Sequence, residues 1–545
     1  MSAIFRFPQL RAGIIQDVAV RTMKDFSNSP LELVLGESLY SERIRIKREP
    51  ESVFTFSRIR GDQKLWNEIH SGLLKSSGES DRAQMAERVI WHYAEEIGGT
   101  FDPGVYRFAT KAVPWGFNWL LHAASVKRFL PWGMTQALQS RLHILGEVAA
   151  LQRLSKKGTI LLVPTHQSNI DSILIGYVIY LMGLPPFSYG AGLNLFTNPV
   201  LSFFMSRLGA FTVDRKKTNA IYKATLKNYS TRILREGIHS IFFPGGGRSR
   251  TGAIENHLKL GLLGTGLQAQ IEGLLAGNPS PNVYVVPMVT SYHFVLEASS
   301  LVEEYLEEVG KHRYILAEEE PWQPGKILNF FWKLFSSQSA ITVRIGKPLD
   351  IFGNFVDEEG HSVGPNGTTI DPKRWLMTNG ELRAEPQRDE EYIRELGAQL
   401  VDRFHKENTV LTSHLVAFTF FEMLRKKYPD LDLFRFLRLS LPQRSLPYPD
   451  FLAEAKIFHE RLKETSERGN LFLSEELKSS DTERWVLDGI SQLGLLHDAA
   501  VVRVGDGAIW TEDMNLLYYY RNRLTGYGLS RLRASGLMDA KGFLA

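Results

Sequence analysis

The amino-acid sequence predicts an α/β protein: a mixed, largely parallel sheet flanked by helices, with helical regions before and after it. Between about residues 141 and 375, short β-branched or apolar runs alternate with longer helical patterns. Charged helical patterns with few strands fill the residues on either side. We therefore expect a helical region over 1–140, an α/β domain over 141–375, and a mainly helical region with a short hairpin over 376–545.

The length and composition of the chain exclude several classes of function. A chain of 545 residues exceeds one ordinary core, and 43% hydrophobic with 23% charged residues is typical of globular proteins. The absence of cysteine excludes disulfides, thiolate metal sites and a cysteine nucleophile, and we expect no metal. A net charge of +4 is too small for charge-driven binding of nucleic acid, so we expect no such partner.

Apolar segments raise the question of a membrane span. Residues 172–206 carry no charge, but their continuous apolar run ends at Leu184, before two prolines. That run is short of the roughly 20 residues that a spanning helix needs, so we expect a buried helix followed by an apolar loop. The first residues, MSAIFRFPQLRAGIIQD, lack a small-residue cleavage site, and we expect no signal peptide.

The local elements follow from periodicity and from turn residues. A helix is expected over 80–99, with Ser80 as its N-cap and two glycines at its end. Residues 361–375 are rich in glycine, proline and threonine and predict a loop. The expected strands are TILLV (159–163), FSYGAGL (187–193), GAFTVD (209–214), SIFFP (240–244), VYVVPMV (283–289) and ITVRIG (341–346).

A histidine and an aspartate follow the first of these strands. In VPTHQSNIDS (163–172), His166 precedes an apolar helix and Asp171 lies in its first turn, where it can fold back on the imidazole. Histidine has an ordinary pKa near neutral pH, so a histidine oriented by a carboxylate suits general-base catalysis. The alternative is structural: a histidine that closes the turn and an aspartate that stabilises the helix N-terminus.

A basic loop follows the strand 209–214. Arg215, Lys216 and Lys217 come directly after it, at the strand end where α/β sheets place ligand-binding loops. These cations could grip a phosphate, and a solvated basic loop is the alternative.

The stretch IFFPGGGRSRTG (241–252) gives the strongest signal. A buried strand runs into Gly245, Gly246 and Gly247, which permit close backbone approach to a ligand. The residues that follow, Arg248, Ser249 and Arg250, favour an anion site. The spacing superficially resembles a phosphate loop, but alanine stands at 253 in place of the required lysine, so nucleotide hydrolysis is not expected. A glycine-rich turn without a ligand is the alternative.

The fourth stretch, VYVVPMVTSYHFVLE (283–297), reads as a buried strand that Pro287 breaks. On its own this stretch indicates plain core.

Together and in this order, the four stretches resemble the glycerol-3-phosphate acyltransferases of the wider glycerolipid acyltransferase superfamily, in their long bacterial type. The family's H-x-x-x-x-D is matched by His166 and Asp171, its G-A-F block ending in arginine by residues 209–215, its F-x-E-G-G/T-R-S-R-T/S-G by FFPGGGRSRTG, and its proline strand by Pro287. One position departs from the pattern: Gly245 stands where the third block carries glutamate.

The resemblance implies an acyltransferase that moves a fatty acyl group from an acyl thioester to glycerol-3-phosphate, in the first step of phospholipid synthesis. His166 would be the general base and Asp171 its orienting partner. It implies that the phosphate is held by Arg215, Arg248, Ser249 and Arg250, that amides of Gly245, Gly246 and Gly247 stabilise the oxyanion, and that Pro287 belongs to an acyl-site strand. No cofactor is implied beyond acyl-CoA or acyl carrier protein as co-substrate.

The resemblance also implies a phospholipid membrane surface as partner, with the protein on the cytoplasmic face, as at a bacterial inner membrane. The basic-apolar segment 326–335 and the apolar helix expected over 408–424 are candidates for docking on the bilayer. Dihydroxyacetone phosphate or lysophosphatidate are alternative acceptors, since each is a phosphate monoester with a hydroxyl. A non-catalytic scaffold that binds lipid or carrier is the alternative from another class.

Overall fold

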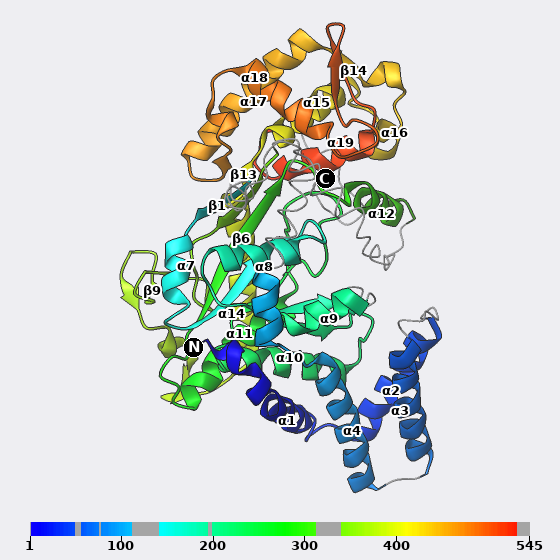
Figure 1. Cartoon of the computed structure of the whole chain (residues 1–545), viewed down its shortest axis with the longest axis vertical. Coiled ribbons are helices and arrows are strands. Elements are labelled where there is room, and N and C mark those ends of the chain that lie inside the picture. The colour runs from blue at the N-terminus through cyan, green and yellow to red at the C-terminus, as the bar shows by residue number, and fades with distance from the viewer. Residues whose placement is uncertain are drawn as a thin grey trace.

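The computed structural model describes residues 2–48, 56–75, 78–111, 141–193, 199–311 and 339–530. In Figure 1 the N-terminal helices lie at the bottom, the main sheet in the middle, and the C-terminal helices at the top. The expected fold class is confirmed: a largely parallel sheet carries helices on its faces, with helical regions before and after it. The segment 326–335 lies outside the described residues.

The main sheet has seven strands in the order β1-β7-β6-β2-β5-β3-β4. Neighbouring strands run parallel except β6 and β7, which are antiparallel. The strands are β1 Leu142–Gly146, β2 Thr159–Pro164, β3 Ser188–Gly192, β4 Ala210–Val213, β5 Ser240–Ile241, β6 Val283–Tyr292 and β7 Ile341–Ile345.

Helices cover both faces of this sheet and extend beyond it. They are α1 Phe7–Asp25, α2 Leu31–Arg48, α3 Phe56–Leu74, α4 Glu79–Ile97, α7 Val148–Leu154, α8 Asp171–Leu181, α9 Pro199–Arg207, α10 Ala220–Arg235, α11 Leu260–Leu275, α12 Ala298–Lys311, α14 Pro386–Lys406, α15 Thr412–Lys427, α16 Leu433–Leu437, α17 Tyr448–Glu467, α18 Thr482–Leu493 and α19 Met514–Arg521. Among the described residues, none of these helices is long and apolar enough to span a bilayer.

Smaller elements connect or follow the main ones. They are the short strands β8 Phe355–Val356, β9 Ser362–Val363, β10 Thr369–Ile370, β11 Met377–Thr378, β12 Glu381–Leu382, β13 Thr409–Val410, β14 Ser445–Pro447, β15 Phe472–Leu473, β16 Arg503–Gly505 and β17 Ala508–Trp510, and the 3-10 helices η1 Ala3–Arg6, η4 Pro372–Leu376, η5 Leu441–Arg444, η6 Glu476–Lys478 and η7 Asn522–Leu524.

The central strands are buried on both faces, as parallel strands between helical layers usually are. In β2, Ile160 and Leu162 pack into the core that contains α8 and the C-terminal helices, whereas Leu161 and Val163 pack against α11 and α14. Successive residues of a strand point to opposite faces, so one run of four apolar residues serves both cores. These cores continue past residue 375, and the expected domain boundaries stay a prediction.

Several local expectations were wrong in detail. The strand expected over 240–244 is only two residues long, and β1 was not anticipated. The helix α4 begins at Glu79, one residue before Ser80, with Gly78 as its N-cap. The expected loop 361–375 contains two short strands and a 3-10 helix.

The helix expected over 408–424 does not face a membrane. It corresponds to α15, whose residues from Thr412 to Phe421 are all buried. The helices α17, α18 and α19 surround it. Its apolar character therefore reflects a central position in the C-terminal core, and it has no free face for the bilayer.

Protonation of His239 is expected to destabilise the sheet. The amide of Ile160 in β2 donates to His239 Nδ1 at 3.1 Å, and an imidazolium cannot accept this bond. Burial lowers the pKa of His239 to about 4. In the unfolded chain, the His239 imidazole takes up a proton below its ordinary pKa of about 6.5. The free energy of unfolding is therefore highest above that pH and falls as the pH drops toward 4, by about 3 kcal/mol in total.

Denaturant unfolding at pH 7.5 and at pH 4.5 checks this prediction. In His239→Asn the side-chain oxygen can take the place of Nδ1 without titrating, so the loss of stability between the two pH values should shrink. His361→Asn, at a side chain 59% exposed, is the matched control. An unchanged pH dependence in His239→Asn would contradict the assignment.

Candidate active site

The site lies at the carboxyl ends of three parallel strands. His166 follows β2, and Arg215 follows β4. Residues 242–252, which we call the glycine-arginine loop, follow β5. These strands belong to the consecutive stretch β2-β5-β3-β4 of the sheet. Parallel strands end at one edge, so segments far apart in the sequence meet there.

His166 and Asp171 form the pair that their spacing predicts. Asp171 is the first residue of α8, and its Oδ2 lies 2.9 Å from His166 Nδ1. The Asp171 side chain is 0% exposed and that of His166 is 12% exposed. Among the described residues, none hydrogen-bonds His166 Nε2. The imidazole is therefore held at one nitrogen and available at the other.

The Asp171 carboxylate is fully engaged. Its Oδ2 also accepts hydrogen bonds from the amides of Gln167 at 2.7 Å and Ser168 at 2.9 Å, and its Oδ1 accepts one from the Tyr292 hydroxyl. Burial and the negative charge of Asp171 raise the pKa of Tyr292 well above its ordinary value, so this hydroxyl keeps its proton as a donor. The turn 166–171 is thus folded around one carboxylate, which fixes the imidazole.

The glycine-arginine loop lies directly against His166. The amide of Ser249 donates to the His166 carbonyl at 2.8 Å. Gly246 has a φ of +69°, a conformation that glycine adopts without strain, and its amide donates to the Phe243 carbonyl. The Phe243 ring packs against the imidazole, and the centroids of the two rings lie 4.3 Å apart. The structure therefore joins the first and third predicted blocks into one site.

Both arginines of the loop are paired with carboxylates. Arg248 Nη1 lies 4.0 Å from Glu297 Oε1, and the Arg248 side chain is 5% exposed. Arg250 Nη1 lies 2.6 Å from Glu308 Oε2, on α12. Glu297 also accepts the Ser168 hydroxyl at 2.8 Å, and burial raises its pKa although Arg248 opposes this. A guanidinium has five donor hydrogens, so each arginine retains donors for a ligand.

Two further cations border the glycine turn. A Cβ added at Gly247 would lie 3.9 Å from Arg215 Nη1, and one added at Gly246 would lie 2.7 Å from Lys259 Nζ. Burial and then the positive charge of Arg215 lower the pKa of Lys259. Like charges are brought close at this turn, as in sites that receive an anion.

Lys217 has a different role from the one predicted for the basic loop. Its ammonium is buried, 3.2 Å from Asp62 Oδ2 and in an ion pair with Glu96. Both carboxylates belong to the N-terminal helices, so the phosphate-gripping role is wrong for Lys217. Its contacts instead anchor the loop that carries Arg215.

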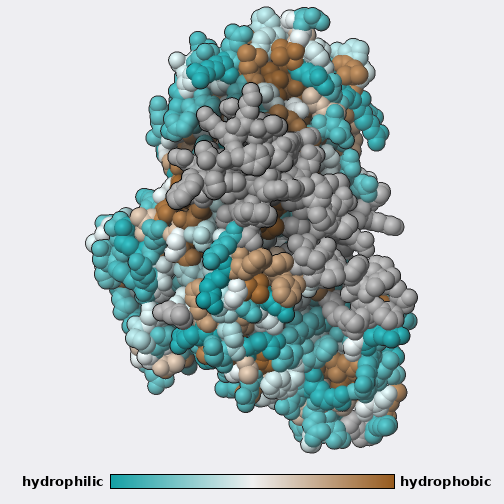
Figure 2. Space-filling model, viewed as in Figure 1, coloured by the Kyte–Doolittle hydropathy of each residue, from teal (hydrophilic) through white to brown (hydrophobic). Residues whose placement is uncertain are grey.

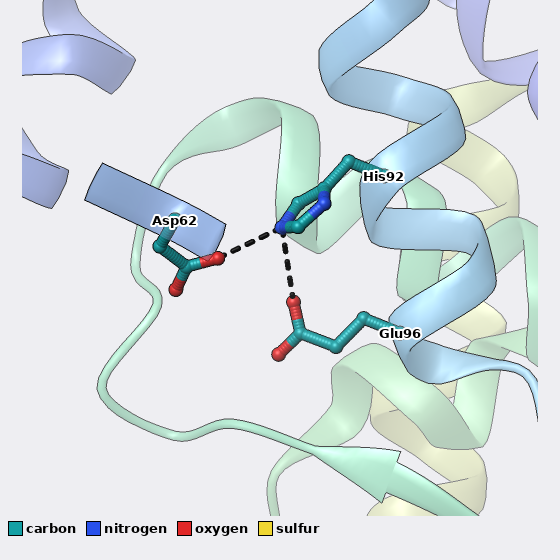
Figure 3. Close-up of side chains that lie close together, drawn as sticks. All are labelled: Asp62, His92 and Glu96. Atoms are coloured by element: carbon teal, nitrogen blue, oxygen red, sulfur yellow. Dashed lines mark hydrogen bonds and ion pairs between the residues drawn. The ribbon is translucent and has the colours of Figure 1, made fainter. Parts of the chain in front are cut away.

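The same carboxylates surround His92 in a cluster that has metal-ligand chemistry (Figure 3). His92 Nε2 lies 2.8 Å from Asp62 Oδ1, and Arg45 also pairs with Asp62. Burial alone would raise the pKa of Asp62, but the hydrogen bond from His92 and the charges of Lys217 and Arg45 lower it below its ordinary value. Two resident cations already neutralise these carboxylates, so the cluster is an ion-pair network.

Pro287 lies within an unbroken strand. The interpretation of a strand broken at proline is wrong, because β6 continues from Val283 to Tyr292. The neighbouring β7 pairs with β6 only from Met288 onward, and Gly346 donates to the Pro287 carbonyl at 2.8 Å. The missing amide of proline thus falls where the antiparallel ladder ends. Pro287 pairs with Val163, three residues before His166.

The C-terminal region contributes contacts that the sequence did not reveal. Asn522 donates to the Thr251 carbonyl at 3.0 Å, and the buried Arg523 donates to the Thr290 carbonyl at 2.7 Å. A Cβ at Gly252 would lie 2.3 Å from the carbonyl oxygen of Tyr519 in α19, so only glycine fits at position 252 against this helix. The run LLYYYRNRL (516–524) therefore packs on the glycine-arginine loop.

Comparison with known proteins finds relatives that match this part of the chain. The Acyltransferase family is matched by residues 146–291. The glycerol-3-phosphate acyltransferase of Pseudomonas paraeruginosa is 30% identical over 229 residues, 42% of this chain and 24% of that protein. Those of Pasteurella multocida and Pseudomonas entomophila are 31% and 26% identical, over 46% and 53% of this chain and 29% and 32% of their own lengths.

The matched part of this chain thus spans between 24% and 32% of the length of these relatives. The resemblance expected from the four sequence blocks is confirmed. The segment that matches the Acyltransferase family, residues 146–291, contains His166, Asp171 and the loop arginines.

Proposed function

We propose that this chain transfers a fatty acyl group from an acyl thioester to the hydroxyl of glycerol-3-phosphate, as in the first step of phospholipid synthesis. The observation that carries the proposal is the imidazole of His166, held at Nδ1 by buried Asp171 and lying beside a loop with several cations. This arrangement places a base for a hydroxyl and an anion site for a phosphate together, at the carboxyl ends of the parallel strands.

His166 Nε2 takes the proton from the acceptor hydroxyl as the oxygen attacks the thioester carbonyl. Asp171 fixes the imidazole tautomer and stabilises its protonated form. Collapse of the tetrahedral intermediate breaks the carbon–sulfur bond, and the imidazolium returns the proton to the leaving thiolate. The products are an ester and a free thiol, and the base is regenerated.

The phosphate of the acceptor is held by Arg215, Arg248 and Arg250, with the hydroxyl of Ser249, whose amide is already donated to the His166 carbonyl. The Ser249 hydroxyl donates to the Ala253 carbonyl at 2.7 Å, so it reaches the phosphate as a donor only after its O–H rotates. Lys259, which the sequence did not single out, adds a cation over the same turn. Fixing the phosphate places the hydroxyl at the base and makes the reaction effectively intramolecular.

The glycine turn is the candidate for oxyanion stabilisation. The amide of Gly246 is already donated to Phe243, so the role falls to Gly245 and Gly247. Pro287 borders the same sheet edge beside Val163 and contributes to the wall of the acyl site. The thioester is acyl-CoA or acyl carrier protein, and this chemistry requires no further cofactor.

Attachment to a phospholipid membrane on its cytoplasmic face, as at a bacterial inner membrane, belongs to the same proposal. Aromatic side chains support it: Phe108, Tyr180 and Phe203 are 59%, 42% and 45% exposed. Figure 2 shows an apolar patch at mid-height, over the region of α8. Arg207 lies 4.0 Å over the Phe203 ring and adds a positive charge suited to anionic lipid.

Dihydroxyacetone phosphate and lysophosphatidate remain competing acceptors, because each presents a phosphate and a hydroxyl to the same cations. A panel of the three acceptors plus glycerol, with product identified by mass spectrometry, tests the assignment. The proposal predicts the highest kcat/KM with glycerol-3-phosphate and a large loss with glycerol, which lacks the phosphate. Equal rates with glycerol would contradict a phosphate site.

Replacing Arg250 by glutamine should weaken recognition of the acceptor and spare the chemistry. A charged hydrogen bond contributes about 1.5–3 kcal/mol, so KM for glycerol-3-phosphate should rise about 10- to 100-fold. The rate with glycerol should change little. Arg394→Gln, on an exposed side chain of α14, is the matched control. A fall in kcat without a rise in KM would contradict the phosphate role.

A further inference from the structure

A glutamate outside the predicted blocks holds the backbone of the proposed base. Glu255 lies in the segment between the glycine-arginine loop and α11. Its Oε1 accepts the amide of His166 at 2.7 Å. Ser249, from the glycine-arginine loop itself, donates its amide to the His166 carbonyl. Both peptide groups of His166 are therefore fixed by the residues that follow β5.

The Glu255 side chain occupies the space beside Gly245. A Cβ added at Gly245 would lie 3.1 Å from Glu255 Cγ and 3.6 Å from its Oε1. Only a tenth of real Cβ contacts are that close, so a larger side chain at 245 and the present Glu255 would compete for one volume. The site thus receives, from position 255, a carboxylate at the place where position 245 offers none.

Stability alone gives little reason for this carboxylate. Burial has the largest effect on the Glu255 carboxyl and raises its pKa. The hydrogen bond from His166 and the charge of Arg523 lower the pKa by less. Its Oε2 is buried, with no hydrogen-bond partner among the described residues. A buried oxygen without a partner is costly, and such groups are concentrated at functional sites.

We propose that Glu255 is the positioning residue of the proposed base: from the space that Gly245 leaves open, its carboxylate holds the His166 backbone so that Nδ1 meets Asp171 and Nε2 meets the acceptor. This inference rests on the proposed function. Glu255 acts through His166 and need not touch the substrate.

A cycle of four proteins tests the inference: the unchanged chain, Glu255→Ala, Gly245→Glu, and the double variant. Displacing a reacting group by about 1 Å costs about 100-fold, so Glu255→Ala should lower kcat by about 10- to 100-fold with KM for the acceptor nearly unchanged. Gly245→Glu should also lose activity, because two side chains then crowd one space. The double variant should regain at least about 10-fold over either single variant.

Independent, additive losses in the double variant would overturn the proposal. Glu255→Gln keeps an oxygen that can accept the His166 amide, so it should retain most of the activity. If Glu255→Gln were as impaired as Glu255→Ala, with equal thermal midpoints, positioning through this hydrogen bond would be wrong.

Hydrogen exchange at the His166 amide separates this inference from the proposed function. Protection should be lost in Glu255→Ala and restored in the double variant, whether or not the protein turns over. A protected amide in a protein without acceptor-dependent activity would count against the proposed function alone. Normal turnover with an amide that Glu255→Ala leaves protected would overturn the role of Glu255 alone.

Discussion

Replacing His166 by alanine is expected to lower kcat for acyl transfer by about 1000-fold, because a positioned general base contributes about 100- to 10 000-fold. The side chain is 12% exposed and its imidazole has no hydrogen-bonding partner besides Asp171 among the described residues, so the fold should survive. Steady-state kinetics with acyl-CoA and glycerol-3-phosphate, beside circular dichroism, measure both properties.

His361→Ala is the control for this experiment, because His361 lies at an exposed position between β8 and β9. It should keep full activity. Retention of more than about a tenth of the rate by His166→Ala would mean that another group removes the proton.

Replacing Asp171 by asparagine is expected to reduce both activity and stability. The carboxylate accepts from His166, Tyr292 and two backbone amides, and an amide NH2 would face some of these donors. Activity should fall about 100-fold or more, since the imidazole loses its orientation and its counter-charge. The unfolding free energy should drop by about 1–3 kcal/mol, the cost of leaving a buried donor unpaired.

Tyr292→Phe distinguishes these contributions. It removes one donor to Oδ1 and leaves the carboxylate with its bonds to the 166–168 turn, so its effect on activity should be much smaller than that of Asp171→Asn. Activity and thermal midpoint should be measured for both variants. Equal losses of activity would show that Asp171 acts on the fold and not on the base.

The parts of the site that depend on local spacing were predictable from the sequence. A buried strand followed by an apolar helix fixes where its turn lies, so His166 and Asp171 could be paired across five residues. The same reasoning placed the glycine-arginine loop at a strand end. Short apolar runs also predicted six of the seven strands of the main sheet, whereas β1 was missed.

The remaining parts depend on contacts between segments far apart in the chain. Glu255 is 89 residues from His166, and Arg523 is 233 residues from Thr290. A single glutamate in AIENHLK carries no periodic signal, although its position ten residues after Gly245 is visible in the sequence. The helix α15 was mistaken for a membrane-docking segment for a related reason. Its apolar pattern belongs to a helix in the core, and hydropathy alone does not distinguish such a helix from one that faces a membrane.

The phosphate residues also show this limit. Arg215 and Lys217 are two positions apart in one basic run, and their side chains go to different places. The difference arises from the N-terminal helices, which offer Asp62 and Glu96 to Lys217. No property of the loop itself distinguishes the two cations.

The most direct test of the central claim is thiol release from palmitoyl-CoA by the unchanged chain and by His166→Ala, each with and without glycerol-3-phosphate. The chain has no cysteine, so a thiol reagent reports only the released coenzyme A. We expect release only when both glycerol-3-phosphate and His166 are present. Release that ignores either one, or binding of the thioester without any release from acyl-CoA or acyl carrier protein, would contradict the account and favour a non-catalytic scaffold or a hydrolase.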